Sequence, residues 1–215
     1  MMHQSVREES RTPEQHLEQE WQLFQHIEEG ATSNLCRTWE ATRPVVVVGR
    51  NTPLASQVVM EACGEDEVPV IRRFTGGGAV VLGPGCLNYA LGLSLVVHPD
   101  LTDVTESFRV ILGRIAAALP VAGLTTHGAT DLALNGRKVS GNAQRRGRRA
   151  LLHHGTLLYA FDARLAARYL KEPERQPTYR ASRRHAEFMG NLPLSRKALE
   201  ARLKTALEWQ PLTGF

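Results

Sequence analysis

The residues best suited to chemistry lie in two stretches of the chain, and the first is rich in glycine. In RRFTGGGAVVLGPGCLNY, which ends at Tyr89, Arg72 and Arg73 precede the triplet 76–78. Glycine loses unusual conformational freedom on folding, so a triplet suggests that something must approach the backbone closely. Free N–H groups in such a loop bind anions, and neighbouring arginines add charge and bidentate geometry. A β-bulge or a tight strand connection without a ligand fits the triplet alone equally well.

This glycine stretch does not match the common nucleotide-binding motifs. The run that starts at Gly76 lacks the third glycine of G-x-G-x-x-G, and no G-x-x-x-x-G-K-[ST] sequence occurs anywhere in the chain. Neither a dinucleotide-binding Rossmann site nor a P-loop is therefore indicated.

The second stretch, DLALNGRKVSGNAQ at 131–144, centres on a lysine. Asn135-Gly136 is the preferred pair for a type I′ turn and predicts a hairpin. Strand alternation predicts one face with Lys138, Ser140 and Asn142, and another with Arg137, Val139 and Gly141. A lysine among small residues can reach a carboxylate or phosphate as a point charge. Taken alone, an edge-strand lysine that blocks aggregation is the commoner case.

Histidines and arginines follow the lysine stretch. His153 and His154 are neighbours on a predicted strand, so their side chains should point to opposite faces and should not form one metal site. A buried, hydrogen-bonded histidine is the commoner outcome. The arginine-rich run 145–149 is most simply a solvated hairpin tip, and its alternative is a landing patch for an acidic partner.

Periodicity predicts the elements that must position these residues. Thr12, Pro13 and Gln15 form a capping-box start for a helix that Gly30 is placed to end. Further helices are predicted from helical spacing at 103–120, 162–170 and from 195 onward. Strands are predicted from β-branched or alternating runs at 45–48, 68–74, 79–82, 87–95, 131–134, 137–145 and 150–161. The segment 171–193 is expected to be irregular. Strands in runs joined by hairpins indicate an α+β fold with a mixed or largely antiparallel sheet.

Composition sets the broad class of the protein. The chain has 215 residues, 42% hydrophobic and 22% charged, which suits a soluble globular domain with one sizeable core. A formal charge of +4 suits nucleotides, acidic proteins or nucleic acid equally. Three cysteines without a C-x-x-C pair argue against a disulfide framework and for a reducing compartment. No signal peptide and no apolar run of about 20 residues occurs, so we expect a cytoplasmic protein without a membrane partner.

Together with HHGTLL at 153–158, the two stretches resemble the lipoate-protein ligase family, within the biotin/lipoate ligase and octanoyltransferase superfamily. Order, spacing and residue types agree over roughly 45–162, with weaker echoes at 182–183 and 191–192. The resemblance implies the biotin/lipoate ligase catalytic-domain fold. Residues 1–11 are expected to form a flexible tail, followed by a single catalytic domain at 12–215. Because six residues follow Trp209, no C-terminal accessory domain is expected.

The resemblance also implies an activity. ATP, with Mg²⁺, would activate lipoate or octanoate to an acyl-adenylate, and the acyl group would pass to a lysine of an apo lipoyl-carrier domain with an acidic surface. No nucleic-acid partner is expected. Lys138 would be the catalytic residue, in contact with the acyl carboxylate and the α-phosphate, and Asp131 would help to place the metal or nucleotide. The implied nucleotide and acyl-adenylate site comprises Arg73, Thr75, Gly76, Gly77, Gly78, Ala79, Val80, Val81, Asn88, Asp131, Ser140, Gly141, Ala143, His154, Gly155 and Thr156.

These roles are physically reasonable. A carboxylate that attacks a phosphate brings negative charges together, so fixed cations and N–H donors lower the barrier, and oriented binding adds to this. The chain departs from the family pattern at Leu82, where many ligases carry histidine, and at Thr130-Asp131, where Asn-Asp is usual. The family's Asn-x-Ala-x-Asp-Glu stretch is not recognisable at 14–29. Without an accessory domain, a separate accessory ligase chain could support activation, or the protein could accept preformed lipoyl-adenylate.

Three rival functions are weighed against the ligase. A lipoyl or octanoyl transferase with a cysteine thioester is disfavoured because residues 87–215 contain no cysteine, and Cys86 lies inside a predicted strand. A biotin ligase usually carries Gly-Arg-Gly-Arg in its glycine loop, which is absent here. A catalytically inactive carrier-binding homologue is the third alternative, against which the retained Lys138 argues.

Overall fold

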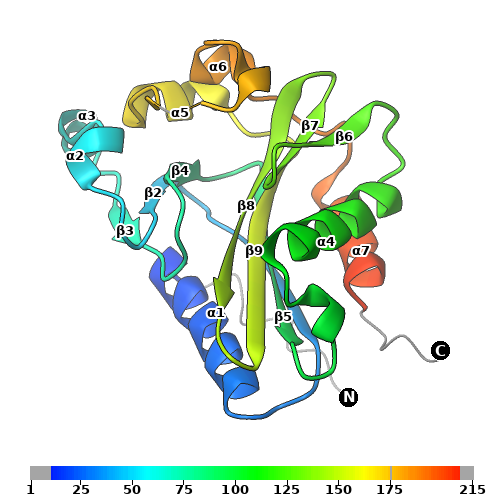
Figure 1. Ribbon diagram of the computed structural model, residues 1–215. Helices are drawn as coiled ribbons and strands as arrows, with labels where there is room; N and C mark the ends of the chain where they lie inside the picture. The colour runs from blue at the N-terminus through cyan, green and yellow to red at the C-terminus, as the bar shows by residue number, and fades with distance from the viewer. Residues whose placement is uncertain (1–10, 175, 209–215) are drawn as a thin grey trace.

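The protein contains two sheets with helices packed around them (Figure 1). The computed structural model describes residues 11–174 and 176–208. The larger sheet is antiparallel throughout and has the order β1-β5-β9-β8-β7-β6. Its strands, in that order, are Leu35–Glu40, Cys86–Ser94, Ala150–Leu158, Arg137–Arg146, Asp131–Leu134 and Leu124–His127. The predicted α+β class with largely antiparallel pairing is confirmed.

The smaller sheet is mixed and has the order β3-β2-β4. Its strands, in that order, are Val70–Arg72, Val45–Val48 and Ala79–Leu82. β2 runs parallel to β3 and antiparallel to β4. All four valines of β2 are buried, as expected for a β-branched strand covered on both faces.

The two faces of the larger sheet are covered by different helices. Helix α1 (Pro13–Glu28) begins with the predicted Thr12–Gln15 capping box and lies on one face. Its approach depends on Gly92 of β5, where a Cβ atom would lie 2.7 Å from the Ile27 side chain. On the other face, α4 (Val104–Ala118) and α7 (Arg196–Leu207) pack over the main hydrophobic core, which includes Leu87, Leu91 and Leu93 of β5.

Most of the remaining helices surround the smaller sheet and the far end of the β7–β8 hairpin (Figure 1). They are α2 (Leu54–Gln57), α3 (Met60–Glu65), α5 (Ala163–Tyr169), α6 (His185–Phe188) and the 3₁₀ helix η2 (Thr178–Arg180). The 3₁₀ helix η1 (Pro99–Leu101) lies between β5 and α4 and contacts α4. A second core joins the small sheet to α5. None of the helices in the described ranges is long and apolar enough to cross a membrane.

Several elements differ from the sequence prediction. Strands β1 and β6, and helices α2 and α3, were not predicted, and β9 ends at Leu158 rather than at 161. β1 has no clear alternation, and it forms by pairing with β5 at the edge of the sheet. The segment expected to be irregular, 171–193, contains η2 and α6. The predicted tail, up to residue 10, and the end 209–215 lie outside the described residues.

Candidate functional site

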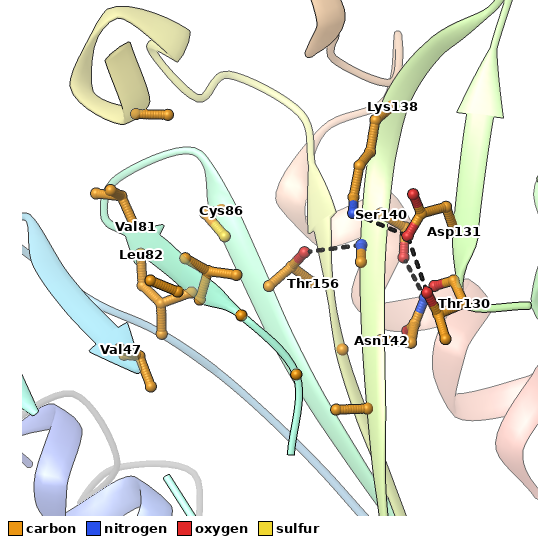
Figure 2. A pocket seen from close by; sticks show the side chains of 18 of the residues that line it. Val47, Val81, Leu82, Cys86, Thr130, Asp131, Lys138, Ser140, Asn142 and Thr156 are labelled. Carbon is orange, nitrogen blue, oxygen red and sulfur yellow. Dashed lines mark hydrogen bonds and ion pairs between the residues drawn. The ribbon is translucent and has the colours of Figure 1, made fainter. Parts of the chain in front are cut away.

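A pocket of about 460 Å³ lies between the small sheet and the β7–β8 hairpin. Figure 2 shows that its two sides differ in chemistry. The apolar side carries Val47, Val81, Leu82 and Cys86, and the polar side carries Thr130, Asp131, Lys138, Ser140, Asn142 and Thr156. A pocket of this size, with a few convergent polar groups beside an apolar wall, suits a ligand with an apolar tail and an anionic head.

The structure explains two of the three glycines of the triplet. A Cβ atom on Gly76 would meet nothing within 4 Å. Gly77 has a φ of +91°, which favours glycine, and its Cβ atom would lie 2.8 Å from an Arg73 nitrogen. A Cβ atom on Gly78 would lie 2.6 Å from the side-chain oxygen of Gln57. The triplet therefore serves the packing of the loop at two of its three positions.

Arg73 braces this glycine loop from inside. Its side chain is buried, and its Nη2 atom donates to the carbonyl oxygens of Gly76 at 2.8 Å and Gly78 at 2.9 Å. Burial lowers the pKa of Arg73 to about 10, opposed by the nearby Glu20 carboxylate, so the guanidinium stays charged at neutral pH. Its donors are used by the loop in this structure, and direct contact with a ligand stays a prediction.

A buried hydrogen-bond chain links α1 to the loop. Glu20 accepts from Trp39 Nε1 at 2.9 Å and lies 2.6 Å from His154 Nδ1. His154 Nε2 lies 2.8 Å from the Thr75 hydroxyl oxygen, which accepts from Arg73 Nε at 2.9 Å. Because a carboxylate only accepts, Nδ1 carries a proton, and in the tautomer whose Nε2 is unprotonated that nitrogen accepts from the Thr75 hydroxyl. The chain fixes Arg73 and with it the shape of the loop.

Sequence reasoning missed Glu20. It occupies an inward position of α1 between Leu17 and Phe24, both of which are buried. An acidic residue on the apolar stripe of an amphipathic helix was the available signal, because a buried carboxylate needs partners.

The two neighbouring histidines lie on opposite faces of β9, as predicted. His154 joins the chain that starts in α1, and His153 contacts Tyr89 and Gln144 on the other side. Complete burial lowers the pKa of His153 to about 3, and His154 adds to this effect. In the described part of the chain, no group of three or more histidine, cysteine or acidic side chains is arranged to hold a metal ion.

Lys138 lies inside the pocket and pairs with an acid. Its Nζ atom is 2.8 Å from Asp131 Oδ1, which also accepts from the Thr130 hydroxyl at 3.2 Å. Asp131 Oδ2 accepts from the Tyr179 hydroxyl at 2.7 Å. Burial raises the pKa of Tyr179, as does the Asp131 charge, so the phenol keeps its proton. Figure 2 shows the lysine and the aspartate side by side at the polar wall.

A β-bulge sets the direction of the lysine. Leu132 pairs with Ser140 and Ala133 pairs with Lys138, so one residue of β8 has no partner. A Cβ atom on Gly141 would lie 3.0 Å from Lys138 Cε, so the lysine extends over Gly141. The predicted placement of Gly141 on the opposite face is wrong, because simple alternation does not anticipate a bulge. Ser140 and Asn142 do share a face, with a 3.0 Å hydrogen bond between them.

The segment after α5 secures the lysine strand. The Gly190 N–H donates to the Lys138 carbonyl oxygen at 2.9 Å. Arg137 Nε donates to the Met189 carbonyl oxygen at 2.9 Å, and Arg183 Nη2 donates to that of Gly136 at 2.8 Å. This segment also supplies Tyr179, a site residue for which the sequence gave no signal beyond an aromatic in an arginine-rich run.

Most of the predicted site residues meet in the pocket. Those that line it are Arg73, Gly77, Gly78, Ala79, Val80, Val81, Asn88, Asp131, Lys138, Ser140, Gly141, Ala143, His154, Gly155 and Thr156. Thr75 is buried behind Arg73, and Gly76 is exposed on the loop away from the pocket wall. Asn88 donates to the carbonyl oxygens of Trp39 and Cys86, so it braces β1 against β5.

Cys86 lines the apolar side of the pocket as a buried thiol. Burial raises its pKa, and the charge of Glu40 raises it further. A thiol without thiolate character is a poor nucleophile, so Cys86 acts as a small apolar wall residue.

The arginine-rich run at 145–149 is not a simple solvated tip. The guanidinium of Arg145 lies 6.0 Å from the Trp21 ring centre, and Arg146 donates to two carbonyl oxygens before α4. The backbone N–H groups of Arg148 and Arg149 donate to Glu28 at the end of α1. The prediction of a solvated tip is wrong for Arg145 and Arg146, since tertiary contacts tie them to the two helices.

Comparison with known proteins places this site in a family context. The model of the lipoyl protein ligase A/B catalytic domain family matches residues 12–201. The chain is 29% identical over 54% of its length to the lipoate-protein ligase LplJ of Bacillus subtilis, and 30% identical over 60% to the human mitochondrial lipoyl amidotransferase LIPT1. It spans 34% of each relative, and less than half of the other curated relatives that it matches.

Solved structures share the fold. A bi-partite lipoate protein ligase from Thermoplasma acidophilum, described together with its E2 lipoyl domain, superposes with a TM-score of 0.73 at 18% identity, over 91% of this chain and 78% of that chain. A lipoate-protein ligase A bound with ATP gives a TM-score of 0.72 at 20% identity, over 88% and 77%.

Proposed function

The chain belongs to the lipoyl protein ligase A/B catalytic domain family, and we propose that it activates lipoate or octanoate with ATP and attaches the acyl group to a lysine of a carrier domain. The observation that carries this proposal is the position of Lys138, whose ammonium lies in a pocket with one apolar and one polar side. An apolar acyl tail suits the first side, and the carboxylate and α-phosphate suit the second.

Charge balance explains how these residues would act. The acyl carboxylate oxygen attacks the α-phosphorus of ATP, and pyrophosphate leaves. Lys138 exchanges its partner Asp131 for the developing acyl-phosphate charge, which a fixed cation stabilises. The amine of the acceptor lysine then attacks the acyl carbonyl, and AMP leaves.

Asp131 would also hold Mg²⁺, as the sequence resemblance implies. Mg²⁺ commonly binds one or two carboxylates together with substrate phosphates, and Asp131 supplies a carboxylate in the wall of the pocket. Both of its oxygens already accept hydrogen bonds or pair with Lys138, so the ion would bind together with the phosphates that draw the lysine away. The ion would neutralise phosphate charge.

The partners and the place of action follow from the same proposal. We expect an apo lipoyl-carrier domain with an acidic surface as the acceptor, and action in the cytoplasm. The matched residues cover 40% of the relative from Schizosaccharomyces pombe and 44% of the relative from Mycoplasma pneumoniae. Activation by ATP with the help of a separate accessory chain, or its bypass with preformed lipoyl-adenylate, is part of this proposal.

A second candidate is transfer of a lipoyl group from one carrier to another. The 30% identity to the human protein named as a lipoyl amidotransferase favours it. A thioester on Cys86 is not part of this candidate, since burial raises the pKa of that thiol. An inactive carrier-binding homologue is the remaining alternative.

One assay separates these functions. The purified chain is incubated with apo carrier domain and, in turn, lipoate with ATP and Mg²⁺, lipoyl-adenylate, or an octanoyl- or lipoyl-carrier protein, and the mass of the acceptor is read. We expect acylation with lipoyl-adenylate and a loss of at least 100-fold in rate for Lys138→Ala, because developing charge loses its cation (about 2.7–4 kcal/mol). Lys204→Ala, on the exposed face of α7, is the matched control.

The outcomes point in different directions. Acylation only from another carrier would identify the transferase, and no acylation from any donor would identify the binding homologue. A Lys138→Ala variant that works at the full rate would remove the proposed mechanism.

A further inference from the structure

Gln57 lies at the end of α2, outside both motifs of the sequence, and its side chain lines the pocket. Its Oε1 atom accepts from the Ala79 N–H at 2.6 Å. That N–H belongs to the loop expected to present backbone donors to an anionic ligand. In this structure the protein itself therefore uses the donor that follows the glycine triplet.

The chemistry of this contact fixes the orientation of the amide. An amide NH₂ group cannot accept a hydrogen bond from a backbone N–H, so Oε1 must face Ala79 and Nε2 must point away from it. Within residues 11–174 and 176–208, Nε2 donates to no side chain or carbonyl oxygen, and it is not sealed in the interior. Two N–H donors are thus left for a group that enters the pocket.

The backbone around Gln57 is held in place. The Lys171 N–H donates to the Gln57 carbonyl oxygen at 2.9 Å, and the Lys171 ammonium donates to that of Ala55 at 2.7 Å. The next residue, Val58, forms a β-bridge with Leu170. A donor on a segment held from both sides loses little freedom when it meets a ligand.

Gly78 completes the arrangement. All three of the nearest atoms that a Cβ on Gly78 would meet belong to the Gln57 amide, the closest at 2.6 Å. The backbone of Gly78 is not in the left-handed region, so alanine would be excluded only by this side chain. Gly78 makes room for Gln57, whereas the sequence suggested room for the ligand.

We propose that Gln57 binds the ligand. The Ala79 N–H and the absence of a side chain on Gly78 orient the Gln57 amide so that its Nε2 donates to an anionic oxygen of the acyl-adenylate. This inference rests on the proposed function and adds to it a binding residue from α2. The group recognised is a phosphate or acyl oxygen, since Nε2 offers donors only.

The first test compares charge at this position. Binding of lipoyl-adenylate is measured by isothermal titration calorimetry for the unmodified chain, Gln57→Glu and Gln22→Glu. Glutamate keeps an acceptor for Ala79 but turns a second, negatively charged oxygen toward the anion, so we expect at least tenfold weaker binding. Gln22 is exposed on α1, and the same change there should leave the affinity within twofold.

The second test is a double-mutant cycle with Gly78→Ala and Gln57→Ala. Gly78→Ala alone should weaken binding about as much as Gln57→Ala does, because the new methyl group displaces the amide. In the Gln57→Ala background, Gly78→Ala should not weaken binding further, because the Gln57 amide with which the new methyl group would collide is absent. Gln57 is half-buried and both changes are small, so folding is checked simply by thermal unfolding.

Three results would count against these ideas. If Gly78→Ala weakens binding equally in both backgrounds, the ligand itself occupies the space over Gly78 and the inference is wrong. If Gln57→Glu binds lipoyl-adenylate as tightly as the unmodified chain does, Gln57 does not contact the anion and the inference is also wrong. Failure of the unmodified chain to bind lipoyl-adenylate at all would instead overturn the proposed function, and the inference with it.

Discussion

Thr75 joins two parts of the site through a single hydroxyl group. Its oxygen accepts from Arg73 Nε and its proton is placed to reach His154 Nε2. Because Thr75 is buried, water cannot replace it. Removal of the hydroxyl leaves an imidazole nitrogen unpaired and leaves Arg73 Nε with only its longer bond, of 3.3 Å, to the Gly76 carbonyl oxygen.

We predict that Thr75→Val lowers the free energy of unfolding by about 1–3 kcal/mol, the usual cost of stranding buried partners, and raises the KM for the acyl substrate. Valine keeps the shape of threonine, so the change isolates the hydroxyl. Thr75→Ser, which restores the hydroxyl with less packing, is the control and should recover the KM. Chemical denaturation and steady-state kinetics measure both effects. Equal KM values for the valine and serine variants would show that the hydroxyl does not support the site.

Individual site residues differ in how well the sequence could predict them. Lys138 and Asp131 were predicted because they lie in one short motif, and the structure brings them within 2.8 Å. Glu20, Gln57 and Tyr179 were not predicted, since each comes from a distant segment and depends on a contact that only folding creates. Residue types within a short motif can be recognised in a single sequence, whereas a contact between residues far apart in the chain leaves no local pattern to recognise.

At the scale of elements, the end of β2 and the glycine loop fit together closely. A Cβ atom on Gly49 would lie 1.8 Å from the Gly77 carbonyl oxygen, far inside the contact distance. The Arg50 N–H donates to the Thr75 carbonyl oxygen at 2.8 Å, which ties the loop to the strand end. The glycine at the end of β2 is therefore as necessary for the loop as the triplet itself.

Substitution of Gly49 tests this fit. We predict that Gly49→Ala lowers the free energy of unfolding by about 3 kcal/mol, because backbone must move to admit the methyl group. Gly76→Ala is the matched control, since its Cβ atom would meet nothing within 4 Å, and its stability should change by less than about 0.5 kcal/mol. Both values come from urea denaturation. If Gly76→Ala instead weakens lipoyl-adenylate binding at unchanged stability, the predicted ligand contact at Gly76 is supported.

Helices and strands with a strong sequence periodicity were predicted, and strands that form only because they pair with a neighbouring strand were not. The capping box of α1 and the alternation of β5 are local signals, and both elements were found. β1 and β6 are edge strands whose pairing with β5 and β7 defines them, and the bulge in β8 has no local signature. The bulge brings Lys138 over Gly141, which strict alternation had placed on the opposite face.

For the whole molecule, buried neutral histidines link folding to pH. Burial lowers the pKa of His153 to about 3, and burial with the charge of Arg37 lowers that of His16 to about 4. The pKa values of His98 and His185 are also lowered, mainly by burial. An unfolded histidine titrates near 6.5, so below that pH the unfolded chain binds protons that the folded chain refuses.

Because these pKa values are lowered in the folded protein, the histidines contribute their full stabilisation above pH 6.5. The free energy of unfolding then falls as the pH drops toward their pKa values in the folded state. For His153 the loss between pH 7 and pH 5 is about 2 kcal/mol, from the linkage slope of about 1.4 kcal/mol per pH unit. Acidic side chains with ordinary unfolded pKa values near 4 change little in this window, so the histidines dominate it.

The neutral variant His153→Gln isolates one of these groups. It should be less stable than the unmodified chain at pH 7, because its contacts with Tyr89 and Gln144 are disturbed, yet it should lose about 2 kcal/mol less between pH 7 and pH 5. Urea denaturation at the two pH values gives both slopes. Parallel slopes would mean that His153 does not stay neutral inside the sheet, and hence that the interior between β9 and α4 admits a charge, contrary to its complete burial.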